Sequence, residues 1–193
     1  MTKDDSTPRI DIRSRADLRD WLMAHHATAR TVWLVLYKKH HPDHLPWPDV
    51  VEELLCWGWI DSLPRALDAD RTMLRASPRK DSSAWSGINK AHVARAIASG
   101  AMTAAGLAKV DAAKANGMWD FLEDVERLEV PDDLATAFDA HPPARAEWDS
   151  FPPSARRGIL EWIKQAKRPQ TRADRITQTA TLAQKGQRAN QWR

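Results

Sequence analysis

Prolines and glycines divide the second half of the sequence into segments of helical length. Segments begin at Pro131, Pro143, Pro153 and Pro169, and others end before Gly100, Gly117 and Gly186. Proline is tolerated in the first turn of a helix, and glycine commonly ends one. The pattern predicts helices over residues 86–99, 103–116, 131–140, 143–150, 153–167 and 169–185. We therefore expect an all-helical C-terminal half.

The first half alternates between helical and extended patterns. Ser14 and Asp17 have the spacing of a capping box and precede apolar residues at helical spacing, which predicts a helix over residues 15–26. Residues 31–38 (TVWLVLYK) are β-branched and aromatic with both faces apolar, as is typical of a central buried strand. A second helix is expected over residues 49–57, ending at Gly58.

A hairpin is predicted after this helix. Residues 59–67 and 71–77 flank the turn-forming residues 68–70 (DAD). The fold class is therefore α+β, with a small, mainly antiparallel sheet and helices in the N-terminal half, followed by the all-helical C-terminal half. We expect two parts, residues 1–85 and 86–193, which could also pack as one compact domain.

Composition places the protein among folded chains of a reducing compartment. Ten tryptophans among 193 residues indicate large rings that fill a core or line a groove. The single cysteine, Cys56, excludes an internal disulfide. The N-terminus has no apolar signal segment, and no apolar run approaches the roughly 18 residues of a membrane span. We expect a cytoplasmic protein without a membrane partner.

Charge is distributed unevenly along the chain. Residues 153–193 contain ten Lys or Arg against two acidic residues, a net charge of +8. Residues 111–149 contain eleven Asp or Glu against three basic residues, a net charge of −8. The favoured interpretation is that the two segments neutralise each other. The alternative is that the basic helices bind phosphates or an acidic partner.

The segment from Cys56 to Lys90 is the densest group of residues with binding chemistry. Arginines beside hydroxyls and free backbone N–H groups are typical of sites for phosphate, sulfate or carboxylate. Asp61 could orient one of the arginines or act as a base. The candidate ligand-binding residues are Trp59, Asp61, Arg65, Arg75, Arg79, Ser83, Trp85 and Asn89. The structural alternative is an ordinary ion pair of Asp61 with an arginine, with the tryptophans filling the core.

Other clusters give weaker signals. His40, His41, Asp43 and His44 fit no zinc spacing, so we interpret them as a solvated loop and expect neither a metal nor a cofactor. Cys56 lies on an apolar helix face without a partnered base, which favours a buried structural thiol. Nucleic-acid binding by the basic C-terminal helices is possible but not favoured, because aromatics do not interleave with the charges.

Several motifs together resemble a known bacterial family. They include residues 56–62 (CWGWIDS), 77–80 (SPRK) and 162–169 (WIKQAKRP), in the same order as in the family. The chain is similar over about residues 10–190 to the YdeI/OmpD-associated, bacteriocin-protection family. The resemblance implies a role in tolerance of bacteriocins or antimicrobial peptides and association with an outer-membrane porin. It implies no defined reaction and no catalytic residues.

Three hypotheses follow. The first is a stress-related, non-enzymatic binding protein that holds a small anionic ligand in the Trp/Arg groove. The second is an enzyme acting on a phosphorylated or nucleotide-like small molecule, with Asp61 as base and Arg79 as charge stabiliser. The third is a nucleic-acid or protein adaptor that works through the basic C-terminal helices. The sequence names no protein partner.

Overall fold

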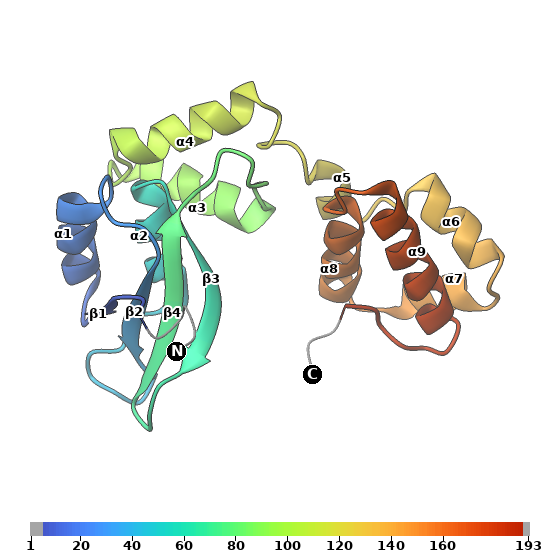
Figure 1. Cartoon of the computed structure of the whole chain (residues 1–193), viewed down its shortest axis with the longest axis horizontal. Helices are drawn as coiled ribbons and strands as arrows, with labels where there is room; N and C mark the ends of the chain where they lie inside the picture. Colours follow the sequence, from blue (N-terminus) through green and yellow to red (C-terminus); the bar gives the residue numbers. More distant parts are fainter. Residues whose placement is uncertain (1–5, 191–193) are drawn as a thin grey trace. The chain divides into compact units, whose positions relative to one another are not determined.

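A computed structural model describes residues 6–190 of the chain and confirms the α+β fold class (Figure 1). These residues form two compact units, which divide between Phe121 and Leu122. Position 85, where the sequence suggests a division, lies inside the first unit. The reason is that the two helices after it pack onto an earlier helix of the same unit.

The first unit is built on a four-stranded sheet with the order β1-β2-β4-β3. Strand β2 (Val32–Tyr37) is central and buried along its whole length, as predicted. Strands β3 (Trp59–Ala66) and β4 (Arg71–Pro78) form the predicted hairpin, and β4 pairs antiparallel with β2. The sequence analysis did not predict β1 (Arg9–Asp11), which pairs parallel with β2 and makes the sheet mixed.

Helices α1 (Arg15–His25) and α2 (Trp47–Cys56) cover one face of the sheet (Figure 1). Ser14 caps α1 as predicted, because its side chain accepts a hydrogen bond from the Asp17 N–H at 3.1 Å. Apolar residues of both helices form the main core with the strands. Among them are Leu18 and Leu22 of α1, Val50 and Leu54 of α2, and Leu34 and Leu74 of the sheet.

Helices α3 (Gly87–Ala98) and α4 (Ala104–Ala115) pack on the other side of α2. Val51 and Leu55 of α2 share a second core cluster with residues of these helices, including Val93 and Val110. Helix α2 therefore lies between the sheet and a further helical layer. Its residues from Val50 to Cys56 are all buried, two glutamates included.

Two glycines allow the tight approach of α4 to α2. A Cβ on Gly106 would lie 2.4 Å from the carbonyl oxygen of Cys56 and 2.7 Å from that of Leu55. Gly58 has a left-handed backbone (φ +72°), and a Cβ there would lie 2.9 Å from the Lys109 side chain. The turn after α2 and the start of α4 can therefore occupy their positions only because both residues lack side chains.

The second unit is all helical, as predicted. Its helices are α5 (Glu123–Glu126), α6 (Asp132–Asp139), α7 (Ala144–Ser150), α8 (Pro153–Lys164) and α9 (Pro169–Ala183). Helix α9 packs against α6, α7 and α8. Phe138 and Trp148 contribute rings in a tilted contact to the core, with centroids 5.3 Å apart. Between residues 6 and 190, no helix has the length and apolar character that a membrane span requires.

Candidate functional site

The sheet separates the predicted site residues onto its two faces. Side chains alternate along a strand, and Asp61 stands opposite Ala76, which belongs to the core under α1 and α2. Arg65 stands opposite Met73, and Met73 belongs to the small cluster on the other face. Arg75 and Arg65 are exposed on that other face. The eight candidates therefore do not form one groove.

Trp59 lies in the main core. It is 1% exposed, and its ring meets that of Trp21 edge to face at a centroid distance of 5.6 Å. Its indole N–H donates to the carbonyl oxygen of His26 at 3.1 Å. A side chain with its polar atom already bonded inside the core has a packing role.

Arg79 is the most unusual of the predicted residues, because it is an arginine that is only 2% exposed. It follows β4 directly, and its backbone N–H donates to the carbonyl oxygen of Gly58 at 2.8 Å. In the side chain, Nη2 donates to the carbonyl oxygen of Ala84 at 2.5 Å. The Nε and Nη1 atoms are buried and have no hydrogen-bond partner. Most of the N–H groups of this guanidinium thus have no acceptor.

Trp85 fixes the plane of this guanidinium. The central carbon of the Arg79 guanidinium lies 3.7 Å from the centroid of the Trp85 ring, a close cation–π contact. Trp85 is itself 2% exposed and packs against the Trp119 ring at 5.2 Å. Burial lowers the pKa of Arg79 to about 10, although the negative charge of Asp61 acts to raise it. The side chain therefore stays charged at neutral pH.

Asp61 is half-buried on β3. Burial raises the pKa of its carboxyl, while a hydrogen bond from Trp47 and the charge of Arg79 partly offset that increase. Asp61 is the carboxylate whose field acts on Arg79, and it does so through space rather than through a hydrogen bond. Asp61, Arg79 and Trp85 thus belong to one neighbourhood.

Ser83 and Asn89 flank Trp85 in the sequence and are both half-buried. The Ser83 N–H donates to the carbonyl oxygen of Lys80 at 3.0 Å, which closes a turn. The Asn89 N–H donates to Ser86 Oγ at 3.3 Å, which caps the start of α3. Backbone contacts of both residues shape the loop that carries Trp85.

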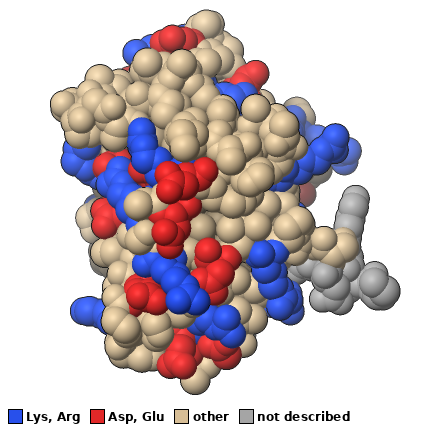
Figure 2. All heavy atoms as spheres, turned by 90° about the vertical axis from the view of Figure 1, so that its left-hand side faces the viewer, with Lys and Arg blue, Asp and Glu red and all other residues tan. Residues whose placement is uncertain are grey.

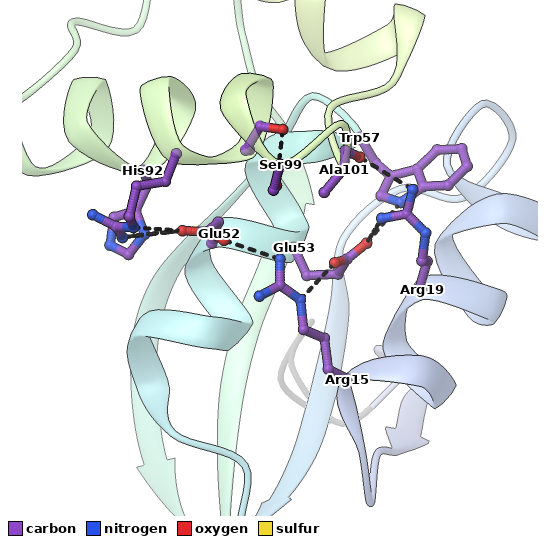
Figure 3. Close-up of polar contacts among 10 residues, drawn as sticks. Arg15, Arg19, Glu52, Glu53, Trp57, His92, Ser99 and Ala101 are labelled. Carbon is purple, nitrogen blue, oxygen red and sulfur yellow. Dashed lines mark hydrogen bonds and ion pairs between the residues drawn. The ribbon is translucent and has the colours of Figure 1, made fainter.

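The sequence analysis missed a carboxylate pair at the centre of the first unit (Figure 3). Glu53 of α2 is 1% exposed, and Figure 3 shows two arginines of α1 directed toward it. Arg15 Nε donates to Glu53 at 2.9 Å and Arg19 Nη1 donates at 2.8 Å. The Trp57 indole N–H adds a third hydrogen bond at 3.1 Å. The charge of Glu53 is therefore fully compensated inside the fold.

Glu52 is held from both neighbouring helices. Arg15 Nη2 reaches it from α1 at 3.1 Å, and Arg95 Nε reaches it from α3 at 3.0 Å. Burial raises the pKa of the Glu52 carboxyl, but the hydrogen bond of Arg15, the contact of His92 and the charges of Arg15 and Arg95 outweigh burial and lower it. His92 completes the cluster on α3 and is 5% exposed.

A sequence signal for this network exists. Glu52 and Glu53 interrupt an otherwise apolar helix, and Arg15 and Arg19 are spaced i, i+4 on one face of α1. Such a match of charges between two amphipathic helices is visible only when their packing is known. Figure 2 shows acidic and basic side chains lying side by side on the face that turns toward its viewer.

The opposite charges of the C-terminal half do pair within the second unit. Lys164 Nζ lies 2.6 Å from Asp124, Arg157 Nη2 lies 2.8 Å from Glu126, and Arg172 Nε lies 2.7 Å from Asp133. Each pair joins the acidic segment to the basic one. These contacts agree with internal neutralisation, the favoured interpretation of the charge pattern.

The histidine-rich loop is held by hydrogen bonds within the loop, to Tyr37 and to Asp70. His40 Nε2 lies 3.0 Å from Asp70, and His44 Nδ1 lies 2.8 Å from the carbonyl oxygen of Tyr37. His41 Nδ1 accepts from the Asp43 N–H at 3.1 Å. Cys56 is buried as predicted, and burial raises the pKa of its thiol to about 11, which leaves it protonated at neutral pH.

Comparisons with known families divide the chain in two. The family described as "Domain of unknown function (DUF8412)" matches residues 10–109, which contain Asp61, Arg79 and Trp85. The family described as "Bacteriocin-protection, YdeI or OmpD-Associated" matches residues 127–186. The predicted resemblance is thus confirmed over the second unit. The search of curated proteins and the search of solved structures found no match.

Proposed function

The chain belongs to the family described as Domain of unknown function (DUF8412), and from that premise we propose that it binds a small oxyanion at Arg79. Residues 127–186 are similar to the bacteriocin-protection family, and we infer from this similarity that the chain has a role of that type. In this proposal the protein has a stress-related role, to which the first unit contributes ligand binding. The proposed ligands are carboxylates and phosphates.

One observation carries this proposal: the buried guanidinium of Arg79 has two nitrogens without an acceptor. A buried polar group without a partner costs about 1–3 kcal/mol, and more when it is charged. Proteins therefore rarely retain one without a use for it. Arginine is suited to planar oxyanions because its N–H groups can bind two oxygens at once.

The orientation of Arg79 supports the same conclusion. Stacking on Trp85 and the hydrogen bond to the carbonyl oxygen of Ala84 hold the guanidinium in one plane. A ligand would therefore meet donors that are already oriented, which lowers the entropy cost of binding. Asp61, on β3, would sit beside the bound group and disfavour a second negative charge.

In this proposal the loop of residues 80–86 controls access to Arg79, because Arg79 is almost completely buried and two residues of this loop, Ala84 and Trp85, contact it. This loop contains no helix or strand. Asp81 fixes it to α4 through an ion pair with Lys109 at 2.8 Å and a hydrogen bond from Asn116 to its carbonyl oxygen at 2.9 Å. In this proposal residues 80–83 open to admit the ligand and close over it, while Ala84 and Trp85 keep their contacts with Arg79.

A thermal-shift screen against carboxylates, inorganic phosphate, sugar phosphates and nucleotides tests the proposal. A ligand at 100 times its Kd stabilises the native state by about 2.7 kcal/mol. We expect one ligand class to raise the melting temperature of the native protein and to have no effect on Arg79→Met. Arg75→Met is the matched control, because Arg75 is an exposed arginine of β4, the strand that directly precedes Arg79.

The structural alternative makes a different prediction. If Arg79 serves only the fold, no oxyanion shifts the melting temperature, and Arg79→Met simply lowers it. If Arg79 is kept for binding, Arg79→Met is as stable as the native protein or more so, because an apolar side chain removes the desolvation cost of the charge.

Catalysis is a second candidate, favoured by the raised pKa of the half-buried Asp61 beside a cation. In that case Asp61 would act as the base and Arg79 as the charge stabiliser. Incubation with the stabilising ligand, followed by NMR, would then show turnover that Asp61→Asn loses while binding is retained. A ligand recovered unchanged would exclude catalysis on that compound.

A further inference from the structure

The ring of His92 touches a cation and an anion through the same nitrogen. Its Nδ1 lies 2.6 Å from Arg95 Nη2 and 3.3 Å from Glu52 Oε2. The ring is buried where α3 packs on α2, and Figure 3 shows it directed at Glu52. The groups that act on it come from α2 (Glu52), α3 (Arg95) and β3 (Asp61).

The short contact decides where the proton on the ring is. A guanidinium has only donors and stays charged at any ordinary pH. The 2.6 Å contact therefore requires Nδ1 of His92 to accept from Arg95. Glu52 also has only acceptor oxygens when ionised, so the 3.3 Å contact joins two acceptors. His92 is thus neutral and carries its proton on Nε2.

Protonation of His92 reverses these relations. A proton on Nδ1 would face an Arg95 N–H at 2.6 Å, which is repulsive, and a Glu52 carboxylate at 3.3 Å, which is attractive. The Arg95 side chain is 57% exposed, so it can move into water at little cost. Glu52 is 12% exposed and would keep Arg15 and gain His92.

We propose that His92 is a pH-sensitive switch. When His92 is neutral, Arg95 is the partner of Glu52 on α3. When His92 is protonated, it replaces Arg95 as that partner. At neutral pH Arg95 is bound at the α2–α3 interface, and at acidic pH it is released to solvent. The junction itself persists, because Glu52 has a cationic partner on α3 in both states.

The switch also changes the charge near the proposed oxyanion site. His92 lies within electrostatic range of Asp61, which in turn acts on Arg79. A charged His92 would offset Asp61 and strengthen oxyanion binding as pH falls. This consequence rests on the proposed function, whereas the exchange of partners does not.

NMR of the unliganded protein tests the exchange directly. Long-range proton–nitrogen spectra distinguish the two neutral tautomers of histidine from the charged ring. We expect the Nε2–H tautomer of His92 at pH 8 and the charged ring at pH 5. The Arg95 Nε–H chemical shift, assigned with Arg95→Met, should differ from that of a solvent-exposed arginine at pH 8 and move to the solvent-exposed value as His92 is protonated.

Two variants keep the test decisive if one of them folds poorly. In Arg95→Met the Nδ1 atom is free to donate to Glu52, so we expect its proton there at pH 8. His92→Asn keeps an acceptor for Arg95 that cannot be protonated, so Arg95 should stay bound from pH 8 to pH 5. Two results would contradict the proposed switch. One is an Nδ1–H tautomer of His92 in the native protein at pH 8, and the other is an Arg95 signal that does not change when His92 is protonated.

Discussion

At the scale of single residues, the charged groups of the first unit differ in how well the fold compensates them. Glu53 accepts three hydrogen bonds, two of them from arginines, and Glu52 is held from two helices. Arg79 is buried and Asp61 is half-buried, and neither has a charged hydrogen-bond partner. Burial lowers the pKa of Arg79 and raises the pKa of Asp61, so it disfavours the charged form of each. Compensated charges indicate a structural role, and uncompensated ones are typical of binding sites.

Asp61 gives a pH-dependent prediction. Because its pKa is raised in the folded state, the native protein is penalised once the carboxyl ionises. We expect Asp61→Asn to increase the free energy of unfolding at pH 7 by about 1 kcal/mol, a common size for one substitution. The gain should shrink as pH falls and disappear below the ordinary aspartate pKa of 3.8, where both side chains are neutral.

Urea unfolding of both proteins between pH 3 and pH 7 measures this difference. A loss of stability in Asp61→Asn at pH 7 would mean that Asp61 and Arg79 form a structural pair. That outcome would count against the proposed oxyanion site as well.

At the scale of elements, helix α2 explains what the sequence could and could not predict. The buried strand β2, the Ser14 cap and the hairpin have local signatures, and each is present in the structure. Strand β1 has only three residues with no apolar run, so its parallel pairing depends on tertiary contacts. Glu52 and Glu53 were missed because only the packing of α1 and α3 on α2 shows that they are buried.

The candidate site was also predictable only in part, because local sequence signals do not show which side chains meet. Arg79 and Trp85 were found from an Arg/Trp-rich segment, and the structure places them in contact. Arg65 and Arg75 share that segment, but the alternation of the strands directs them to the opposite face. Composition identifies a segment, whereas the pairing register decides which members can meet.

The close packing of α4 on α2 gives an element-scale prediction. Gly106→Ala would push a methyl group against the carbonyl oxygens of Cys56 and Leu55, so we expect a loss of about 1–3 kcal/mol in unfolding free energy. Gly158→Ala is the control, because it has open space around its Cβ within α8 and should gain about 0.5–1 kcal/mol. Equal effects in chemical denaturation would contradict the tight α2–α4 contact.

At the scale of the whole molecule, the two units correspond to two different family matches, residues 10–109 and 127–186. The first unit carries the proposed ligand site and the buried charge network. The second unit carries the bacteriocin-protection match, and its basic helices are tied to its own acidic segment. The adaptor hypothesis is weaker for this reason, since paired cations are less available to phosphates.

This pairing predicts weak nucleic-acid binding. In fluorescence anisotropy at 150 mM salt, we expect no measurable binding of a 20-base-pair duplex to the native protein. The triple variant Asp124→Asn, Glu126→Gln, Asp133→Asn removes one carboxylate partner from each of Lys164, Arg157 and Arg172, and it should bind with a logarithmic salt slope steeper by about 2–3. Tight binding by the native protein at this salt concentration would instead favour the adaptor hypothesis.

The central claim is that the guanidinium of Arg79 receives an oxyanion, and arginine side-chain NMR tests it most directly. The Arg79 Nε–H signal, assigned with Arg79→Met, is followed while the oxyanion selected by thermal shift is added. We predict a saturable change in this signal at one ligand per chain, with the Arg75 signal unchanged. A ligand that saturates the protein while the Arg79 signal stays constant would show that Arg79 does not hold it.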